Sequence, residues 1–138
     1  MDEVAALEAA CFSLPWSRRL FEEELKHPDL SSWVVARAEA GGPILGYAGW
    51  WKAGQEAHLV NLAVGPARRR QGLGRELARR VLEDARALGC TEASLEVRAG
   101  NVAAQQLYWS LGFTTAAVRP KYYSDNGEDA LILWKNPL

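Results

Sequence analysis

The 138-residue chain has few cysteines and no long apolar run. Its two cysteines, Cys11 and Cys90, lie far apart, so they form neither the disulfide framework of a small secreted domain nor the close spacing of metal ligands. No apolar stretch approaches the roughly 20 residues that span a membrane, and Asp2 and Glu3 are unlike the basic start of a signal peptide. We therefore expect a cytoplasmic protein without a metal.

The chain also lacks an excess of charge of one sign. Its 16 basic and 17 acidic residues give a net charge of -1, which argues against a general nucleic-acid binder. The segment from Arg68 to Arg80 is locally basic, so a module that binds nucleic-acid phosphates through it stays open as an alternative. The length suits one compact domain, and we expect residues 1–138 to form it.

A segment rich in glycine and arginine, residues 64–75, joins a strand-like run to a predicted helix. Gly72 and Gly74 allow the backbone to approach a ligand closely, and the N-terminus of the helix adds free N–H donors and partial positive charge. The segment matches neither G-x-x-x-x-G-K-[ST] nor the dinucleotide fingerprint. It therefore predicts a different polyanion site, with an ordinary strand-to-helix turn as the alternative.

The remaining patterns predict two helices, a meander of three antiparallel strands, a helix, a strand, a helix and two final strands. Apolar periodicity, the caps Ser17 and Asn101, and the stop at Gly89 support this order. It favours a mixed α/β (α+β) domain with one central, mostly antiparallel sheet flanked by helices. The predicted strands cover residues 32–38, 46–52, 56–64, 93–97, 114–120 and 130–135, and the last two helices cover residues 74–88 and 102–111.

Arg69, Gly72 and Gly74 occupy the key places of [RQ]-x-x-G-x-[GA], which resembles the acetyl-CoA loop of the GNAT superfamily of N-acetyltransferases. Residues 12–17 (FSLPWS), 95–101 (LEVRAGN) and 107–113 (LYWSLGF), with the tyrosine pair 122–123, resemble the RimI branch. That branch acetylates the N-terminal alanine of ribosomal protein S18. Members usually begin with a strand before the first helix, and here either that strand is missing or the chain starts late. If it is missing, a strand from a second copy could cover the exposed edge.

The resemblance implies direct acetyl transfer from acetyl-CoA to an amine in a ternary complex. It implies that the glycine-arginine segment holds the cofactor pyrophosphate, that Asn101 reaches the pantetheine arm, and that exposed strand backbone pairs with the pantetheine amides. The implied cofactor-binding residues are Arg69, Arg70, Gln71, Gly72, Leu73, Gly74, Arg75 and Asn101, with the strand residues Leu62, Ala63 and Val64.

Glu96 is the candidate general base, because a carboxylate among the apolar residues of a strand is unusual and partial burial would raise its pKa. A salt bridge to Arg98 or Arg119 is the alternative interpretation. Tyr108 is the candidate general acid on the strength of the resemblance; its helical pattern alone would place it in the core.

RimI-like specificity implies an acceptor with a small first residue followed by basic ones. Trp16, Tyr122 and Tyr123 are the expected walls of the acceptor site, and Asp129 is expected to meet a basic side chain. Asp125 and Glu128 fit the same role or a solvated loop. A lysine or a small amine as acceptor stays open, and we expect a monomer or weak homodimer.

Overall fold

The structure is a computed structural model that describes residues 2–12, 15–27, 31–37, 39–65 and 72–138. All the expected helices and strands occur, with ends within about two residues of the predicted ones. Ala38, the predicted last residue of the first strand, lies outside the described residues. In chain order the elements are α1 (Asp2–Cys11), α2 (Arg18–Leu25), β1 (Ser31–Arg37), β2 (Ile44–Ala53), β3 (Glu56–Val64), α3 (Leu73–Ala87), β4 (Glu92–Arg98), α4 (Val102–Ser110), β5 (Thr114–Arg119) and β6 (Ala130–Lys135).

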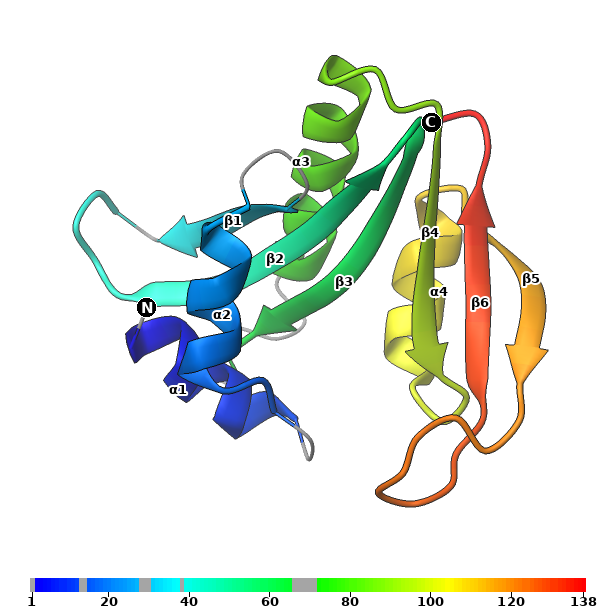
Figure 1. The fold of residues 1–138 in the computed structure, drawn as a ribbon, viewed down its shortest axis with the longest axis horizontal. Coiled ribbons are helices and arrows are strands. Elements are labelled where there is room, and N and C mark those ends of the chain that lie inside the picture. Colours follow the sequence, from blue (N-terminus) through cyan, green and yellow to red (C-terminus); the bar gives the residue numbers. More distant parts are fainter. Residues whose placement is uncertain (1, 13–14, 28–30, 38, 66–71) are drawn as a thin grey trace.

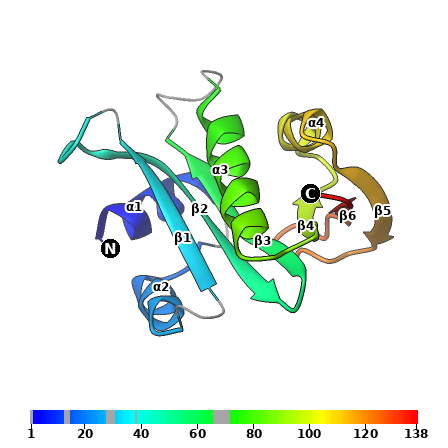
Figure 2. The same ribbon diagram turned by 90° about the horizontal axis from the view of Figure 1, so that it is seen from above.

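The strands form one sheet in the order β1-β2-β3-β4-β6-β5, and every neighbouring pair is antiparallel except β3 with β4. Helices α1 and α2 lie on one face of the sheet, and α3 and α4 lie on the other (Figures 1 and 2). The predicted fold class is therefore confirmed. Among the described elements α1 comes first, and β1 lies at the edge of the sheet.

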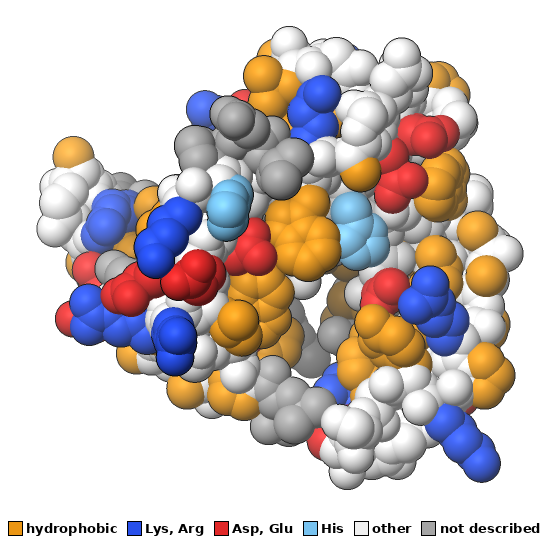
Figure 3. Space-filling view, viewed as in Figure 1, with side chains coloured by type: hydrophobic (Ala, Val, Ile, Leu, Met, Phe, Trp, Pro, Cys, Tyr) orange, Lys and Arg blue, Asp and Glu red, His pale blue; other side chains and the backbone are white. Residues whose placement is uncertain are grey.

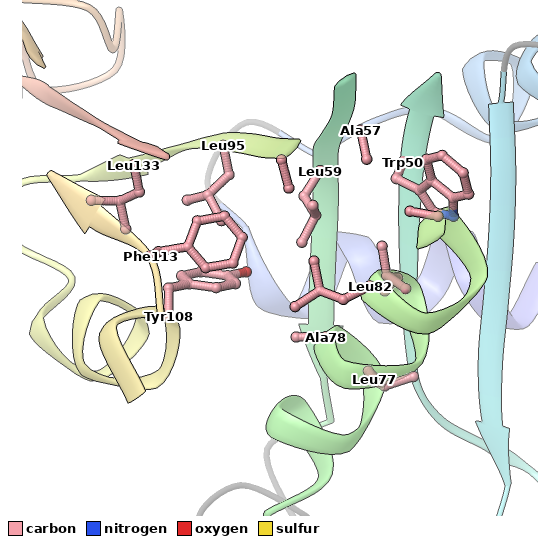
Figure 4. Close-up of a cluster of buried hydrophobic side chains, with 14 of the residues drawn as sticks. Trp50, Ala57, Leu59, Leu77, Ala78, Leu82, Leu95, Tyr108, Phe113 and Leu133 are labelled. Carbon is pink, nitrogen blue, oxygen red and sulfur yellow. The ribbon is translucent and has the colours of Figure 1, made fainter. Parts of the chain in front are cut away.

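The local signals in the sequence explain where the helices begin and what they bury. Ser17 caps α2 by accepting a hydrogen bond from the Leu20 amide, and Asn101 caps α4 by accepting one from the Ala104 amide. Helix α3 turns one apolar stripe toward the sheet, so its charged residues face outward. The buried residues of that stripe are Leu77, Ala78, Val81, Leu82 and Ala85. Figure 4 shows Leu77, Ala78 and Leu82 among them.

Strands β3 and β4 separate half-way along their length. Their parallel pairing runs only from Glu56 with Glu92 to Leu59 with Leu95. Val60 is an extra residue in the pairing of β3 with β2, and such a bulge bends and twists a strand. Beyond it β3 continues beside β2 alone, while β4 continues beside β6 (Figure 1). The expected separation of residues 62–64 from the neighbouring strand is therefore present.

None of the helices in the described ranges is long and apolar enough to cross a membrane.

Candidate active site

The separation of β3 from β4 opens a cleft of about 710 Å³. Figure 3 shows the surface hollowed between the half of the molecule that carries β1 to β3 and the half that carries β4 to β6. Six of the residues expected at a functional site line this cleft: Trp16, Leu62, Glu96, Asn101, Tyr108 and Tyr123. Their sequence positions span more than 100 residues, and the fold brings them to one place.

Glu96 lies in β4 and is partly exposed in the cleft, with 22% of its side chain accessible. The Tyr122 hydroxyl donates a hydrogen bond to its carboxylate, and this bond is the main reason that the pKa of Tyr122 is raised. Arg119 is the ion-pair partner, with Nη1 3.8 Å from Glu96 Oε1. Because the Arg119 side chain is 60% exposed, this pair contributes little to stability.

Tyr108 belongs to both the core and the cleft. The residue is 8% exposed, and its ring packs edge-on against Phe113 with 5.7 Å between the ring centroids (Figure 4). Burial raises the pKa of the Tyr108 hydroxyl well above its ordinary value of 10.0. The hydroxyl is therefore protonated at neutral pH and has a proton to donate. Tyr108 therefore lies in the core, as its helical pattern alone indicates, and it also lines the cleft, as a general acid would have to.

The N-terminus of α3 approaches the cleft closely because position 74 has no side chain. A Cβ at Gly74 would lie 3.2 Å from Leu107 Cδ1, 3.6 Å from Val64 Cγ2 and 3.7 Å from Leu62 Cδ2. Gly72 precedes the helix in the left-handed conformation, with φ 79°. The first-turn amides of α3 are free of helical partners by geometry, which is the arrangement that binds phosphate.

The other expected cofactor-binding residues are distributed around this helix end. Leu73 packs against the main core, Ala63 is buried, and Arg75 Nη1 donates to Ser110 Oγ at 2.8 Å. Arg69, Arg70 and Gln71 lie outside the described residues. The acetyl-CoA pyrophosphate and pantetheine arm fit this architecture, because Gly74 leaves the room that a side chain would fill and the edge of β3 beyond Leu59 is unpaired with β4.

The described arginines of the basic segment are engaged within the protein. Arg79 pairs with Glu76 at 2.9 Å, and Arg80 pairs with Asp84 at 3.0 Å. These pairs reduce the positive charge that the outer face of α3 offers to a nucleic acid.

Arg98 organises the loop between β5 and β6. Its guanidinium binds Asp125 through two hydrogen bonds of 2.9 and 2.8 Å, lies 3.4 Å from Glu128 Oε1, and stacks 3.9 Å from the ring centroid of Tyr123. Hydrogen bonds from Asn126 and the Gly100 amide lower the pKa of Glu128. Neither carboxylate is therefore a simple solvated loop residue.

The remaining expected acceptor residues lie beside this loop. The Tyr122 and Tyr123 rings meet edge-on at 5.1 Å. Asp129 Oδ1 accepts a hydrogen bond from the Lys121 amide at 3.0 Å, and Asp129 is not among the described residues that line the cleft. Its carboxylate has a structural partner, so its expected contact with a basic acceptor side chain stays a prediction.

Glu8 and Asn61 are cleft residues that the sequence interpretation missed. Glu8 is 1% exposed and accepts hydrogen bonds from the Trp16 amide at 2.8 Å, from Asn61 Nδ2 at 2.7 Å and from the Tyr47 hydroxyl. Burial, followed by this bond to Glu8, raises the pKa of Tyr47. The available signal was a carboxylate on the apolar face of α1, in line with Val4.

The cleft is acidic. Among the described residues that line it, four carry carboxylates and one carries a guanidinium, the latter already bound to two of the four. Such a lining favours a cationic ligand, and a protonated amine is one. The site thus combines a helix N-terminus with free amides, an exposed strand edge, a carboxylate and a protonated tyrosine around one cleft.

This chain belongs to the acetyltransferase (GNAT) family, whose model matches residues 1–113. The expected enzyme class, an acetyl-CoA-dependent N-acetyltransferase, is confirmed. The chain is 36% identical over 129 residues to the ribosomal protein bS18-alanine N-acetyltransferase of Escherichia coli K12, covering 92% of this chain and 84% of that protein. It is 39% identical over 135 residues to the N-alpha-acetyltransferase RimI of Mycobacterium tuberculosis, covering 94% and 82%.

A solved structure supports the same assignment. The crystal structure of the ribosomal-protein-S18-alanine N-acetyltransferase from Escherichia coli matches with a TM-score of 0.87 and 32% identity, covering 99% of this chain and 86% of that one. The resemblance to the RimI branch is therefore confirmed by sequence and by fold.

Proposed function

We propose that this protein transfers acetyl from acetyl-CoA to the N-terminal alanine of ribosomal protein S18 in the cytoplasm. The observation that carries the proposal is the meeting of Glu96 and Tyr108 in one acidic cleft, at the point where β3 leaves β4. The names of the relatives supply the acceptor. Residues 1–138 act as one catalytic domain, as a monomer or weak homodimer.

Acetyl-CoA supplies the acetyl group as a thioester. The first-turn amides of α3, with Gln71, Gly72 and Leu73, hold its pyrophosphate, and Arg69, Arg70 and Arg75 add charge. The backbone of Leu62, Ala63 and Val64 pairs with the pantetheine amides as an added strand would. Asn101 completes this side from the N-terminus of α4.

Glu96 accepts a proton from the acceptor ammonium, directly or through one water. The hydrogen bond from Tyr122 fixes the carboxylate in place. Tyr108 provides a proton at its hydroxyl for the leaving sulfur, which its raised pKa allows because the hydroxyl remains protonated until strongly alkaline pH. The amine attacks directly, so the enzyme needs no nucleophile of its own.

The acceptor peptide lies between Trp16 and the Tyr122–Tyr123 pair. Because four carboxylates line the cleft, a positively charged N-terminus followed by basic residues is favoured there. Asp129, at the end of the loop that leads into β6, meets a basic side chain of the peptide.

The test combines binding and turnover. Isothermal titration with acetyl-CoA should show binding, and mass spectrometry should show one acetyl group on the N-terminus of an Ala-Arg peptide with the S18 sequence. Glu96→Gln should lower kcat about 100-fold or more. Glu92→Gln, on the same face of β4 with a hydrogen bond to Asn136, is the matched control and should behave as wild type.

A peptide with a blocked N-terminus and an internal lysine, and a panel of small amines, test the alternative acceptors. Faster turnover on either would replace the N-terminal alanine as the substrate. Absence of acetyl-CoA binding would contradict the proposed enzyme as a whole.

A further inference from the structure

We propose that Glu8 is a positioning residue that ties the loop between α1 and α2 to β3 and thereby sets the affinity for the acceptor peptide. This inference rests on the proposed function, since the acceptor is taken to lie against that loop. Glu8 itself contacts neither substrate; it acts through Trp16.

Glu8 is a buried carboxylate with every oxygen hydrogen-bonded. Glu8 is 1% exposed, and a buried carboxylate is tolerated only when its oxygens are fully hydrogen-bonded. Oε2 accepts from the Trp16 amide, and Oε1 accepts from Asn61 Nδ2 and from the Tyr47 hydroxyl. Three donors from three parts of the chain therefore converge on one side chain of α1.

Two of these donors, Asn61 and Trp16, lie on opposite walls of the cleft. Asn61 follows the Val60 bulge, where β3 turns away from β4, and Trp16 belongs to the loop on the other side. Glu8, Asn61 and Trp16 all line the cleft. A carboxylate with a packing role alone would not need hydrogen bonds to both β3 and the segment around Trp16.

Of the two walls, the loop depends more on Glu8. The backbone of β3 is held independently by its pairing with β2, in which Asn61 lies opposite Gly49. The Trp16 ring packs against the rings of Phe21 and Trp33, with 5.4 and 5.7 Å between ring centroids. The described hydrogen bond of its backbone amide is the one to Glu8. Loss of the carboxylate should therefore release the backbone at Trp16 and leave β3 in place.

Loss of the Glu8 carboxylate should change the KM for the peptide and leave the KM for acetyl-CoA nearly unchanged. The phosphate-binding end of α3 makes no described contact with Glu8, so the KM for acetyl-CoA should stay within about twofold of wild type. The KM for the peptide should rise about tenfold or more in Glu8→Ala, because a hydrogen bond to a charged group fixes the loop. Glu8→Gln keeps one amide oxygen for the Trp16 amide and should raise the KM for the peptide by less.

A merely structural role predicts a different pattern. Val81→Ala, in the buried face of α3, is the matched control because it destabilises the core far from the loop. It should lower the melting temperature and leave both KM values unchanged. Glu8 variants that behaved like Val81→Ala, with lower stability and an unchanged KM for the peptide, would overturn the inference.

A second measurement needs no acceptor. Hydrogen exchange of the Trp16 amide should be slow in the wild type, faster in Glu8→Ala and, to a smaller degree, in Glu8→Gln, and unchanged in Val81→Ala. If the wild type fails to acetylate any peptide but the Trp16 amide follows this pattern, the proposed acceptor is wrong, and the inference that Glu8 holds the Trp16 backbone is retained. If the Trp16 amide exchanges at the wild-type rate in both folded Glu8 variants, Glu8 does not hold the Trp16 backbone and the inference is wrong.

Discussion

Replacing Tyr108 with phenylalanine should separate catalysis from stability. The change keeps the buried ring and its edge-on contact with Phe113 and removes one oxygen. The Tyr108 hydroxyl has no hydrogen-bond partner among the described residues of the protein, so its removal breaks no internal bond. The free energy of unfolding should therefore change by less than about 1 kcal/mol.

The expected increase in the activation free energy is larger than this change in the free energy of unfolding. A general acid contributes about 100- to 10,000-fold to a rate, which corresponds to roughly 2.7 to 5.4 kcal/mol in the activation free energy. Tyr108→Phe should therefore lower kcat by at least about 100-fold while the melting temperature moves by less than about 4 °C. Binding of acetyl-CoA should be retained.

The assay measures kcat on the S18-like peptide, thermal unfolding and acetyl-CoA titration on the same preparations. Trp109→Phe is the control, because Trp109 is the exposed neighbour on α4 and lies outside the residues that line the cleft. A Tyr108→Phe enzyme with wild-type kcat would refute the assignment of the acid. A variant that lost activity and stability together would instead show a structural role.

Three further predictions test other parts of the structure. Gly74→Val should weaken acetyl-CoA binding about tenfold or more, measured by titration, because even a Cβ lies 3.2 Å from Leu107; unchanged affinity would contradict the close approach. Arg98→Met should raise the KM for the peptide several-fold and not that for acetyl-CoA, because the ring of Tyr123 loses the guanidinium beneath it; equal changes in both would argue against this. Burial raises the pKa of Tyr108, so the folded state keeps a proton that the unfolded state releases above about pH 10. Its contribution to stability is present below pH 10 and is lost as pH rises, and Tyr108→Phe should reduce the loss between pH 10 and 11 by about 1 kcal/mol, measured by urea unfolding.

Local patterns in the sequence were sufficient for the helices and strands. The stripe of α3, the caps Ser17 and Asn101, and the alternation in β3 depend on residues within a few positions of each other. The bounds of β3 and β6 were predicted to the residue. The motif around Gly72 and Gly74 also led to the correct family, because it is a short run of residue types that the sequence alone displays.

The candidate site could be predicted from the sequence only as a set of residues. The sequence indicates Glu96, Asn101 and Tyr108 separately, without showing that they meet. Their positions around one cleft support their roles, which stay predictions. The sequence offers Arg98 and Arg119 as ion-pair partners of Glu96. In the structure the partner is Arg119, because Arg98 is bound to Asp125.

What the sequence determined by itself is the order of the elements, the family and the glycine that precedes α3 at position 72, because each is encoded within a short segment. What only the tertiary structure decided is the loop held by Arg98 and the burial of Glu8 among donors from Trp16, Tyr47 and Asn61. The physical reason is that these features depend on which distant groups meet. A buried carboxylate is recognisable as part of the site only when its partners, up to 53 residues away along the chain, are known.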